Sequence, residues 1–235
     1  MGKRKDKRQL SQFSGIDTEV ILTKDLEDEA IYSVQKLFID NYHEANLRYL
    51  EECFNRMRCL TLAKDDGIPI GFSLGDSVKI NLPRFEEPQS VVLHGLGCIE
   101  DKYRKIGLFK HLQKLSSSLG DPIPSGSRRL ICGRVAHPVS FKGISLNESV
   151  VPKINIIPTK WQQEIGKLIA QLYGVEFDEE TFIVRSSAGA IGYPKIKVEA
   201  SKADWNIFRN VDRESGESLL AIVWYPDAPK DWYKE

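Results

Sequence analysis

Long hydrophobic runs are missing from this sequence. No apolar stretch approaches the ~20 residues that a membrane-spanning helix needs, so no such helix is predicted. The charged start of the chain also lacks the hydrophobic segment of a secretory signal. We therefore expect a cytoplasmic protein that has no membrane partner.

Cysteine is scarce, and its spacing forms no motif. Cys53, Cys59, Cys98 and Cys132 include no C-x-x-C pair. Two of them, Cys98 and Cys132, lie in apolar strand-like runs, where cysteine behaves as a small hydrophobic residue. The His, Asp and Glu residues show no metal-ligand spacing either. The sequence thus predicts neither a disulfide framework nor a metal site.

An excess of one charge is also absent. Acidic and basic residues number 33 each in 235 residues, which favours neither nucleic acid nor an anionic membrane as a partner. The exception is a basic run within residues 1–16, which we interpret as a disordered N-terminal arm. Residues 17–226 are expected to form a single domain, followed by a tail at 227–235.

The spacing of apolar residues predicts strands and helices in mixed order. The expected elements are a strand at 18–23, helices around 25–38 and 44–54, a hairpin of 58–64 and 68–74, a loop at 75–89, a strand at 90–99, a helix at 107–119, a strand at 129–135, an irregular segment at 136–158, a helix from 158 to 172, and strands at 181–185 and 218–225 around an excursion at 186–215. The hairpin depends on Asp66-Gly67, a dipeptide typical of tight turns between strands.

The most informative stretch runs from Gly95 to Leu112. Its pattern is a buried strand, a short basic loop and a helix that opens at Gly107. This order brings free backbone N–H groups, a helix N-terminus and the cations Arg104 and Lys105 together, which suits a pyrophosphate. Because Gly107 has no Cβ, the backbone there can approach a phosphate closely.

These residues resemble the GNAT (Gcn5-related N-acetyltransferase) superfamily, whose signature is an aliphatic strand end followed by Arg/Gln-x-x-Gly-x-Gly/Ala. Ile99 fills the aliphatic position, and Arg104-Lys-Ile-Gly107-Leu-Phe109 fills the loop. The resemblance implies an α/β (α+β) GNAT fold, with a central mixed twisted sheet flanked by helices. Phe109 departs from the pattern, which has a small residue there. Its ring must turn into the core or lie over the acyl-CoA.

The resemblance further implies acetyl-CoA or another acyl-CoA as co-substrate, with no metal. The loop amides from Lys105 to Phe109 would cradle the pyrophosphate, and the main chain around Ile99 would bond the pantetheine like an added strand. The cofactor-binding residues implied are Cys98, Ile99, Arg104, Lys105, Ile106, Gly107, Leu108 and Phe109.

Acyl transfer to an amine needs a base and a proton donor, because an ammonium must lose a proton before it attacks a thioester. His94 is the first candidate for the base, since the ordinary pKa of histidine is ~6.5, and Glu100 is the second. A core histidine and a solvated carboxylate at a strand end are the alternatives. The resemblance points to Tyr173 as the acid. His137 is either a further candidate or a turn histidine.

Three functions fit this sequence. The first is transfer of an acetyl or other short acyl group from acyl-CoA to an amine of a small-molecule or peptide acceptor, by direct transfer. The second is a non-catalytic CoA-sensing or partner-binding protein. The third is an acyl-thioester decarboxylase or carrier-protein acyltransferase on the same fold. The last strands of such folds pair between subunits in relatives, which keeps a homodimer open.

Overall fold

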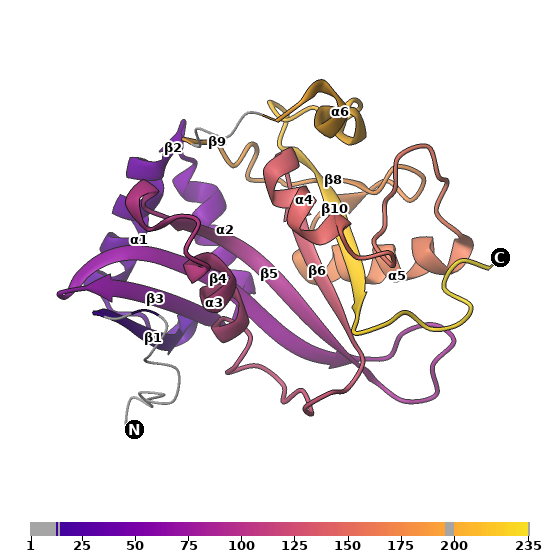
Figure 1. The fold of residues 1–235 in the computed structure, drawn as a ribbon, viewed down its shortest axis with the longest axis horizontal. Coiled ribbons are helices and arrows are strands. Elements are labelled where there is room, and N and C mark those ends of the chain that lie inside the picture. The colour runs from indigo at the N-terminus through magenta and orange to yellow at the C-terminus, as the bar shows by residue number, and fades with distance from the viewer. Residues whose placement is uncertain (1–12, 14, 196–199, 235) are drawn as a thin grey trace. The chain divides into compact units, whose positions relative to one another are not determined.

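The computed structural model describes residues 13, 15–195 and 200–234 (Figure 1). The chain divides into two compact units. The first consists of Met1–Ser77, His94–Pro122 and Ile191–Ile196, and the second of Val78–Leu93, Ile123–Ala190 and Lys197–Glu235. Two long strands, β4 (Ile68–Ile80) and β5 (Gln89–Ile99), contribute residues to both units.

The strands of the first unit follow the order β1-β3-β4-β5. Strand β1 (Ile16–Leu22) pairs antiparallel with β3 (Cys59–Asp65), which pairs antiparallel with β4. Asp66 and Gly67 join β3 to β4 with φ of 46° and 80°, as a tight hairpin turn requires. The predicted hairpin is therefore confirmed. A separate short pair joins β2 (Tyr42–His43) to β9 (Tyr193–Pro194).

The helices of the first unit are α1 (Asp28–Asn41), α2 (Leu47–Arg56) and α3 (Leu108–Leu115), with short 3-10 turns η2 (Thr23–Asp25) and η3 (Asp101–Tyr103). Figure 1 shows α3 in front of the strands and α1 and α2 behind them. Residues 59–63 of β3 are all buried, as expected for a strand covered on both faces. Helix α3 ends four residues before the predicted 119.

The second unit has the strand order β5-β6-β10-β8-β7. Its strands are β6 (Arg129–Val135), β7 (Glu176–Phe177), β8 (Ile183–Arg185) and β10 (Glu217–Tyr225), and its helices are α4 (Pro138–Ser145), α5 (Lys160–Tyr173), α6 (Lys202–Trp205) and η4 (Asn206–Phe208). The last strand, β10, lies between β6 and β8 and is antiparallel to both. The chain passes from β5 to its neighbour β6 through α3.

The predicted α/β class, with a mixed sheet and flanking helices, is confirmed. Two local predictions are wrong. The expected loop at 75–89 begins only after Ile80, because β4 continues through Asp76. The Asp76 carboxylate is buried, and its two oxygens accept a hydrogen bond from the Arg58 Nε at 2.8 and 2.9 Å. The expected irregular segment at 136–158 contains α4, because His137 caps a helix that starts with Pro138.

Three further predictions concern the N-terminal arm, the extent of the domain and the C-terminal tail. The basic arm of residues 1–16 lies mostly outside the described residues. The single domain at 17–226 stays a prediction beside the two compact units. In the tail, Trp232 is fully buried and donates from Nε1 to the Ser149 carbonyl at 2.9 Å.

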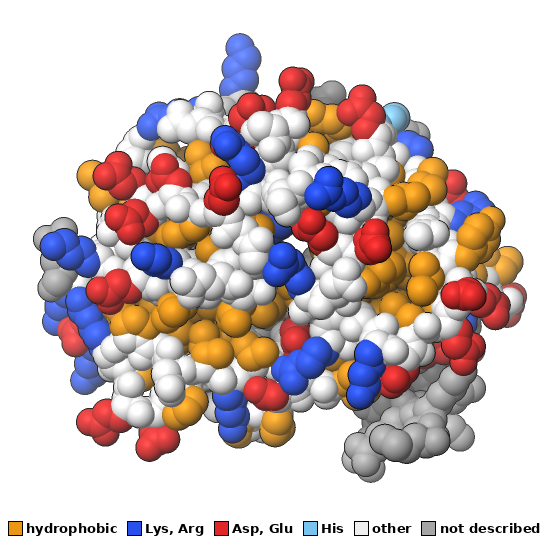
Figure 2. Space-filling model, turned by 180° about the vertical axis from the view of Figure 1, so that it is seen from behind, with side chains coloured by type: hydrophobic (Ala, Val, Ile, Leu, Met, Phe, Trp, Pro, Cys, Tyr) orange, Lys and Arg blue, Asp and Glu red, His pale blue; other side chains and the backbone are white. Residues whose placement is uncertain are grey.

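Among the helices that the structure describes, none combines the length and the apolar character of a membrane-spanning segment. Figure 2 shows cationic and anionic side chains interspersed over one face.

Candidate functional site

The end of β5 is buried and well bonded. Cys98 and Ile99 are 6% and 5% exposed, and the Glu100 N–H donates to the Ile70 carbonyl of β4 at 2.9 Å. The Cys98 Sγ lies 3.6 Å from the Leu37 carbonyl. Burial raises the pKa of the Cys98 thiol well above its ordinary value, so this cysteine is a neutral packing residue. The strand thus holds the next residues on a rigid base.

The following loop has the backbone of an anion-binding turn. Lys105 and Gly107 both have positive φ, 67° and 88°, and alternation of this kind turns neighbouring N–H groups toward one side. Helix α3 then starts after Gly107 without a side-chain cap. A Cβ built on Gly107 has no atom within 4 Å, so the backbone faces open space. Lys105, Ile106 and Gly107 are exposed. This geometry leaves the first amides of α3 free to bind an anion.

Arg104 is held within the first unit. Its Nε donates to the Ile99 carbonyl at 3.0 Å, and Nη1 donates to Asp101 and to the Lys195 carbonyl, both at 2.9 Å. Nη2 donates to Asn41 Oδ1 at 3.1 Å. Of the two cations expected at the pyrophosphate, Lys105 is the exposed one, while the Arg104 guanidinium is already occupied by protein oxygens.

The two side chains that open α3 point to different places. Leu108 is 1% exposed and packs in a core cluster with Leu112, Ile70 and Ile99. Phe109 is 40% exposed, and a Cβ built on Gly97 would lie 3.0 Å from its Cε2. The Phe109 ring therefore lies beside Gly97 of β5, not in the core under α3.

His94 lies on β5 with a half-buried side chain. Burial lowers the pKa of its imidazole to about 4, so the ring is neutral at neutral pH. A neutral ring can accept a proton, but its low pKa makes it a weaker base than the ordinary value suggests. Glu100, the second candidate, is partly exposed, and its Oε2 lies 3.8 Å from Lys102 Nζ.

Tyr173 is buried at the end of α5 in the second unit. Its side chain is 4% exposed, and its hydroxyl donates to the Cys132 carbonyl of β6 at 3.0 Å. Burial raises the pKa of the Cys132 thiol far above its ordinary value. The Tyr173 hydroxyl thus joins α5 to the sheet, which is the contact expected of a helix-end tyrosine in the core.

His137 caps α4. Its Nδ1 accepts the Val139 N–H at 3.2 Å, and its ring meets Trp205 edge-on with centroids 5.2 Å apart. Burial, and then the positive charge of Arg213, lower the pKa of the imidazole. The ring is therefore neutral, as a hydrogen-bond acceptor at a helix start must be. The geometry matches the turn histidine that the sequence left open.

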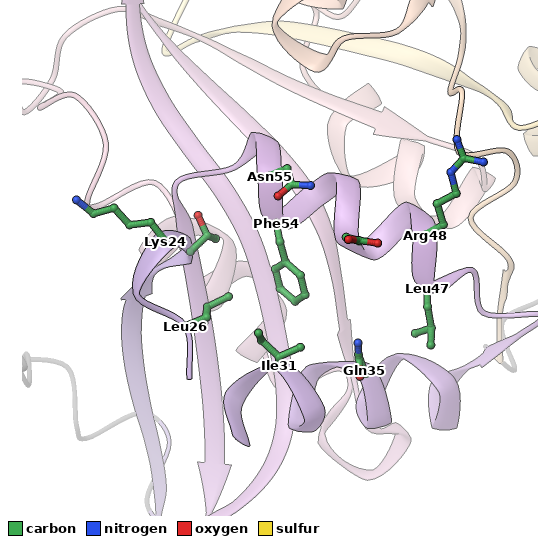
Figure 3. Close-up of a pocket in the computed structure, with 10 residues that line it drawn as sticks. Lys24, Leu26, Ile31, Gln35, Leu47, Arg48, Phe54 and Asn55 are labelled. Carbon is green, nitrogen blue, oxygen red and sulfur yellow. The ribbon is translucent and has the colours of Figure 1, made fainter. Parts of the chain in front are cut away.

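A cavity of about 670 Å³ lies between α1 and α2. Its lining residues are Thr23, Lys24, Leu26, Ile31, Gln35, Leu47, Arg48, Glu51, Phe54 and Asn55. Figure 3 shows the apolar side chains of Leu26, Ile31 and Phe54 turned toward one another, with Lys24 and Arg48 at either end. This lining includes none of the predicted site residues.

Sequence reasoning missed three residues that shape the loop: Asn41, Lys195 and Gly97. Asn41 and Lys195 are more than 60 and 90 positions from Arg104, whose guanidinium they bind. No local pattern marks such contacts. Gly97 did carry a signal, since glycine inside a strand often marks a close approach by another group. Across the described residues, no group of three His, Cys, Asp or Glu side chains could hold a metal ion.

Comparison with known proteins gives matches only in structure. No protein-family model and no curated protein matches the chain. A GNAT family N-acetyltransferase of Escherichia coli, YhbS, solved with CoA, is 13% identical with a TM-score of 0.35. That alignment covers 54% of this chain and 66% of YhbS, just under two thirds of its length.

Two Arabidopsis thaliana structures are also similar. Naa50, solved with a bisubstrate analogue, is 11% identical with a TM-score of 0.39, over 87% of this chain and 97% of that one. NAA60 with acetyl-CoA is 14% identical with a TM-score of 0.35, over 55% and 84%. The chain is thus similar to structures of the superfamily that residues 99–109 resemble.

Proposed function

We propose that residues 99–109 bind an acyl-CoA and that the protein transfers its acyl group to an amine of a small-molecule or peptide acceptor. The observation that carries this proposal is the loop from Glu100 to Gly107. It has two positive-φ residues, open space beside Gly107 and an uncapped helix start, and it follows directly on a buried strand. Such a turn supplies several N–H donors to a pyrophosphate at once.

The residues around the loop would each bind a different part of the ligand. The amides from Lys105 to Phe109 would hold the pyrophosphate, and the exposed Lys105 ammonium would add a positive charge. The Phe109 ring beside Gly97 would limit the space that the ligand can occupy next to β5. The Ile99 carbonyl already accepts from Arg104, so a pantetheine would bond to other main-chain groups of β5 or share this one.

The order of elements in the first unit supports the same proposal. Strand β1, the helices α1 and α2, the hairpin of β3 and β4, and then β5 leading into the loop follow the order that the GNAT resemblance implies. This part of the chain therefore supports a GNAT-type acyltransferase.

For the chemistry, the bound thioester would supply an activated acyl group. The protein would have to take a proton from the acceptor's ammonium so that the free amine can attack the thioester, and the C–S bond would break as the CoA thiolate leaves and takes up a proton. His94 stays the proposed base, because its neutral ring has an acceptor nitrogen at neutral pH, and Glu100 stays the second. Direct transfer needs no covalent link to the protein, so no activated nucleophile is required.

A second function is favoured by the hydrogen bonds that the other two catalytic candidates, Tyr173 and His137, make within the protein. The Tyr173 hydroxyl is bonded to the Cys132 carbonyl, and the His137 Nδ1 is bonded to the start of α4. A protein with the loop but without a free acid would bind acyl-CoA and not transfer the group. This is the CoA-sensing alternative.

The test is a calorimetric titration with acetyl-CoA, followed by an assay of free thiol release in the presence of mixed amines. Binding should stabilise the fold by about 2.7 kcal/mol at a hundred times the dissociation constant. Binding with amine-dependent thiol release supports transfer, and binding alone supports the second function. Absence of binding, with desulfo-CoA as well, contradicts both.

A further inference from the structure

Arg104 joins three separate segments of the first unit. Its guanidinium reaches the Ile99 carbonyl at the end of β5, Asn41 at the end of α1, and the Lys195 carbonyl beside β9. The side chain is 21% exposed, and the Asn41 residue is 6% exposed. Bonds of a charged fork to partly buried acceptors are among the stronger ones in proteins.

Lys195 secures the third segment from its own side. Its N–H donates to the Asn41 carbonyl at 2.8 Å, and its Nζ donates to the Asp40 and Ile39 carbonyls at 3.0 and 3.3 Å. The last turn of α1 contains no basic residue. A cation at that end is favourable because the last carbonyls of a helix carry partial negative charge. Lys195 supplies that cation from more than 150 positions away.

The β2–β9 pair completes this attachment. Tyr42 and His43, which directly follow α1, pair with Pro194 and Tyr193. Residues 193–195 are therefore bound to the end of α1 by backbone pairing, by the Lys195 ammonium and by Arg104. Arg104 is the member of this set that also belongs to the loop.

From these contacts we propose that Arg104 is a positioning residue: it ties the 100–107 loop to the end of α1 and to residues 193–195, so that the loop's anion-binding shape and the docking of that segment depend on each other. This proposal rests on the proposed acyl-CoA site. In this proposal the Arg104 guanidinium binds oxygens of the protein and not the ligand, and Lys105 is the cation that faces the phosphates.

The alternative role for Arg104 is that of a direct phosphate ligand, and the two roles respond differently to lysine. A lysine keeps the positive charge, but its three donors sit on one nitrogen, so it cannot span the separate oxygens that bind Nε, Nη1 and Nη2 of Arg104. A phosphate ligand that acts by charge would be largely rescued by lysine. A positioning residue that acts through its planar guanidinium would not be rescued by lysine.

The experiment compares Arg104→Lys with Arg58→Lys in the full chain. Arg58 is the matched control, because it also forks between partners in the same unit: Asp76, Asp121 and the Ser77 carbonyl. Acetyl-CoA affinity is measured by calorimetry, and exchange of the Lys195 amide by hydrogen exchange with and without acetyl-CoA. Exchange reports how often the segment opens.

We expect Arg104→Lys to weaken acetyl-CoA binding about tenfold and to speed exchange at Lys195 by a similar factor. Acetyl-CoA should slow that exchange in the wild type. Arg58→Lys should lower the melting temperature and change neither quantity. If Arg104→Lys does not fold, Asn41→Ala removes one of the three anchors, and smaller changes in the same directions are expected.

Two results would overturn the proposal. Wild-type affinity in Arg104→Lys would mean that only the charge matters, and weaker binding with unchanged Lys195 exchange would make Arg104 a ligand contact. A wild-type protein that binds no acyl-CoA would reject the proposed function alone. Exchange without ligand would still show whether Arg104 holds residues 193–195.

Discussion

Two strand-to-helix junctions in this chain differ in how they treat the start of the helix. The open junction, residues 100–107, leads from β5 to α3, and the closed junction, residues 136–137, leads from β6 to α4. At the closed junction the His137 ring accepts the Val139 N–H, and Pro138 removes another donor. At the open junction Gly107 stands at the helix start with φ of 88° and no side-chain cap.

The difference shows what a helix start needs before it can bind a ligand. Every helix leaves its first N–H groups without partners in the helix, and most chains satisfy them with a side chain. The closed junction does so for the Val139 N–H. The open junction instead uses its polar side chain, Arg104, to fix the loop, and leaves the amides to solvent or to an anion.

The largest effect should come from closing the open junction. Gly107→Glu places a carboxylate where the phosphates would bind, and we expect acetyl-CoA affinity to fall about a thousandfold, or roughly 4 kcal/mol. Gly67→Glu is the matched control, because Gly67 also has positive φ, 80°, and open space around its Cβ position. Calorimetry on both variants separates the effect of a carboxylate at the site from the effect of backbone strain at a positive-φ position. Equal losses in both would show that strain, not the site, is responsible.

A pH titration should distinguish the histidine of β5 from ordinary histidines. The pKa of His94 is lowered to about 4 by burial, so the unfolded chain binds its proton at higher pH than the folded one. Its contribution to stability is full above about pH 6.5 and is lost as the pH falls toward 4, by roughly 3 kcal/mol. Urea unfolding from pH 4 to 7 should show this slope, and His94→Gln should flatten it. The same slope in His94→Gln would contradict the assignment.

Gly97→Ala should disturb the Phe109 side of the open junction. The added Cβ would lie 2.8 Å from the Phe72 carbonyl oxygen and 3.0 Å from Phe109 Cε2, so the backbone must shift. We expect a loss of about 2 kcal/mol in the free energy of unfolding. Gly143→Ala, in α4, meets no atom within 4 Å and should stabilise the protein slightly. Urea unfolding of both variants gives the sign of each change. A neutral Gly97→Ala would contradict the close packing of the Phe72 carbonyl and Phe109 against Gly97.

The smallest effect concerns the closed junction. His137→Ala removes the acceptor of the Val139 N–H, and we expect about 1 kcal/mol of lost stability with unchanged acetyl-CoA affinity. His137→Asn keeps a capping acceptor and should restore most of the loss. Thermal unfolding measures both variants. A large fall in thiol release for His137→Asn, at normal stability, would instead give His137 a role in transfer.

The sequence predicted those parts of the fold that depend on neighbours along the chain. Asp66-Gly67 marked the hairpin, and Leu108 and Leu112 marked the buried side of α3, because turn preference and helical spacing are local properties. Strand β4 was underestimated, since Asp76 is tolerated in a buried strand only through its partner Arg58. Helix α4 was missed because it begins with a histidine cap, which is a rare signal.

For the candidate site, the sequence indicates a position along the chain but not the partners of its side chains. A glycine before an apolar helix marks the loop, whatever surrounds it. The role of Arg104, in contrast, depends on Asn41 and Lys195, and that of Tyr173 on the Cys132 carbonyl. These partners come from distant segments, so no pattern around either residue could reveal them.

The most direct test of the account is amide hydrogen exchange at the two junctions, with and without saturating acetyl-CoA. We predict that acetyl-CoA slows exchange from Lys105 to Lys110 and leaves Val139 and Ser140, at the start of α4, unchanged. That result would show that the open junction binds the ligand through its backbone. Unchanged exchange from Lys105 to Lys110, or equal slowing at both junctions, would contradict the account.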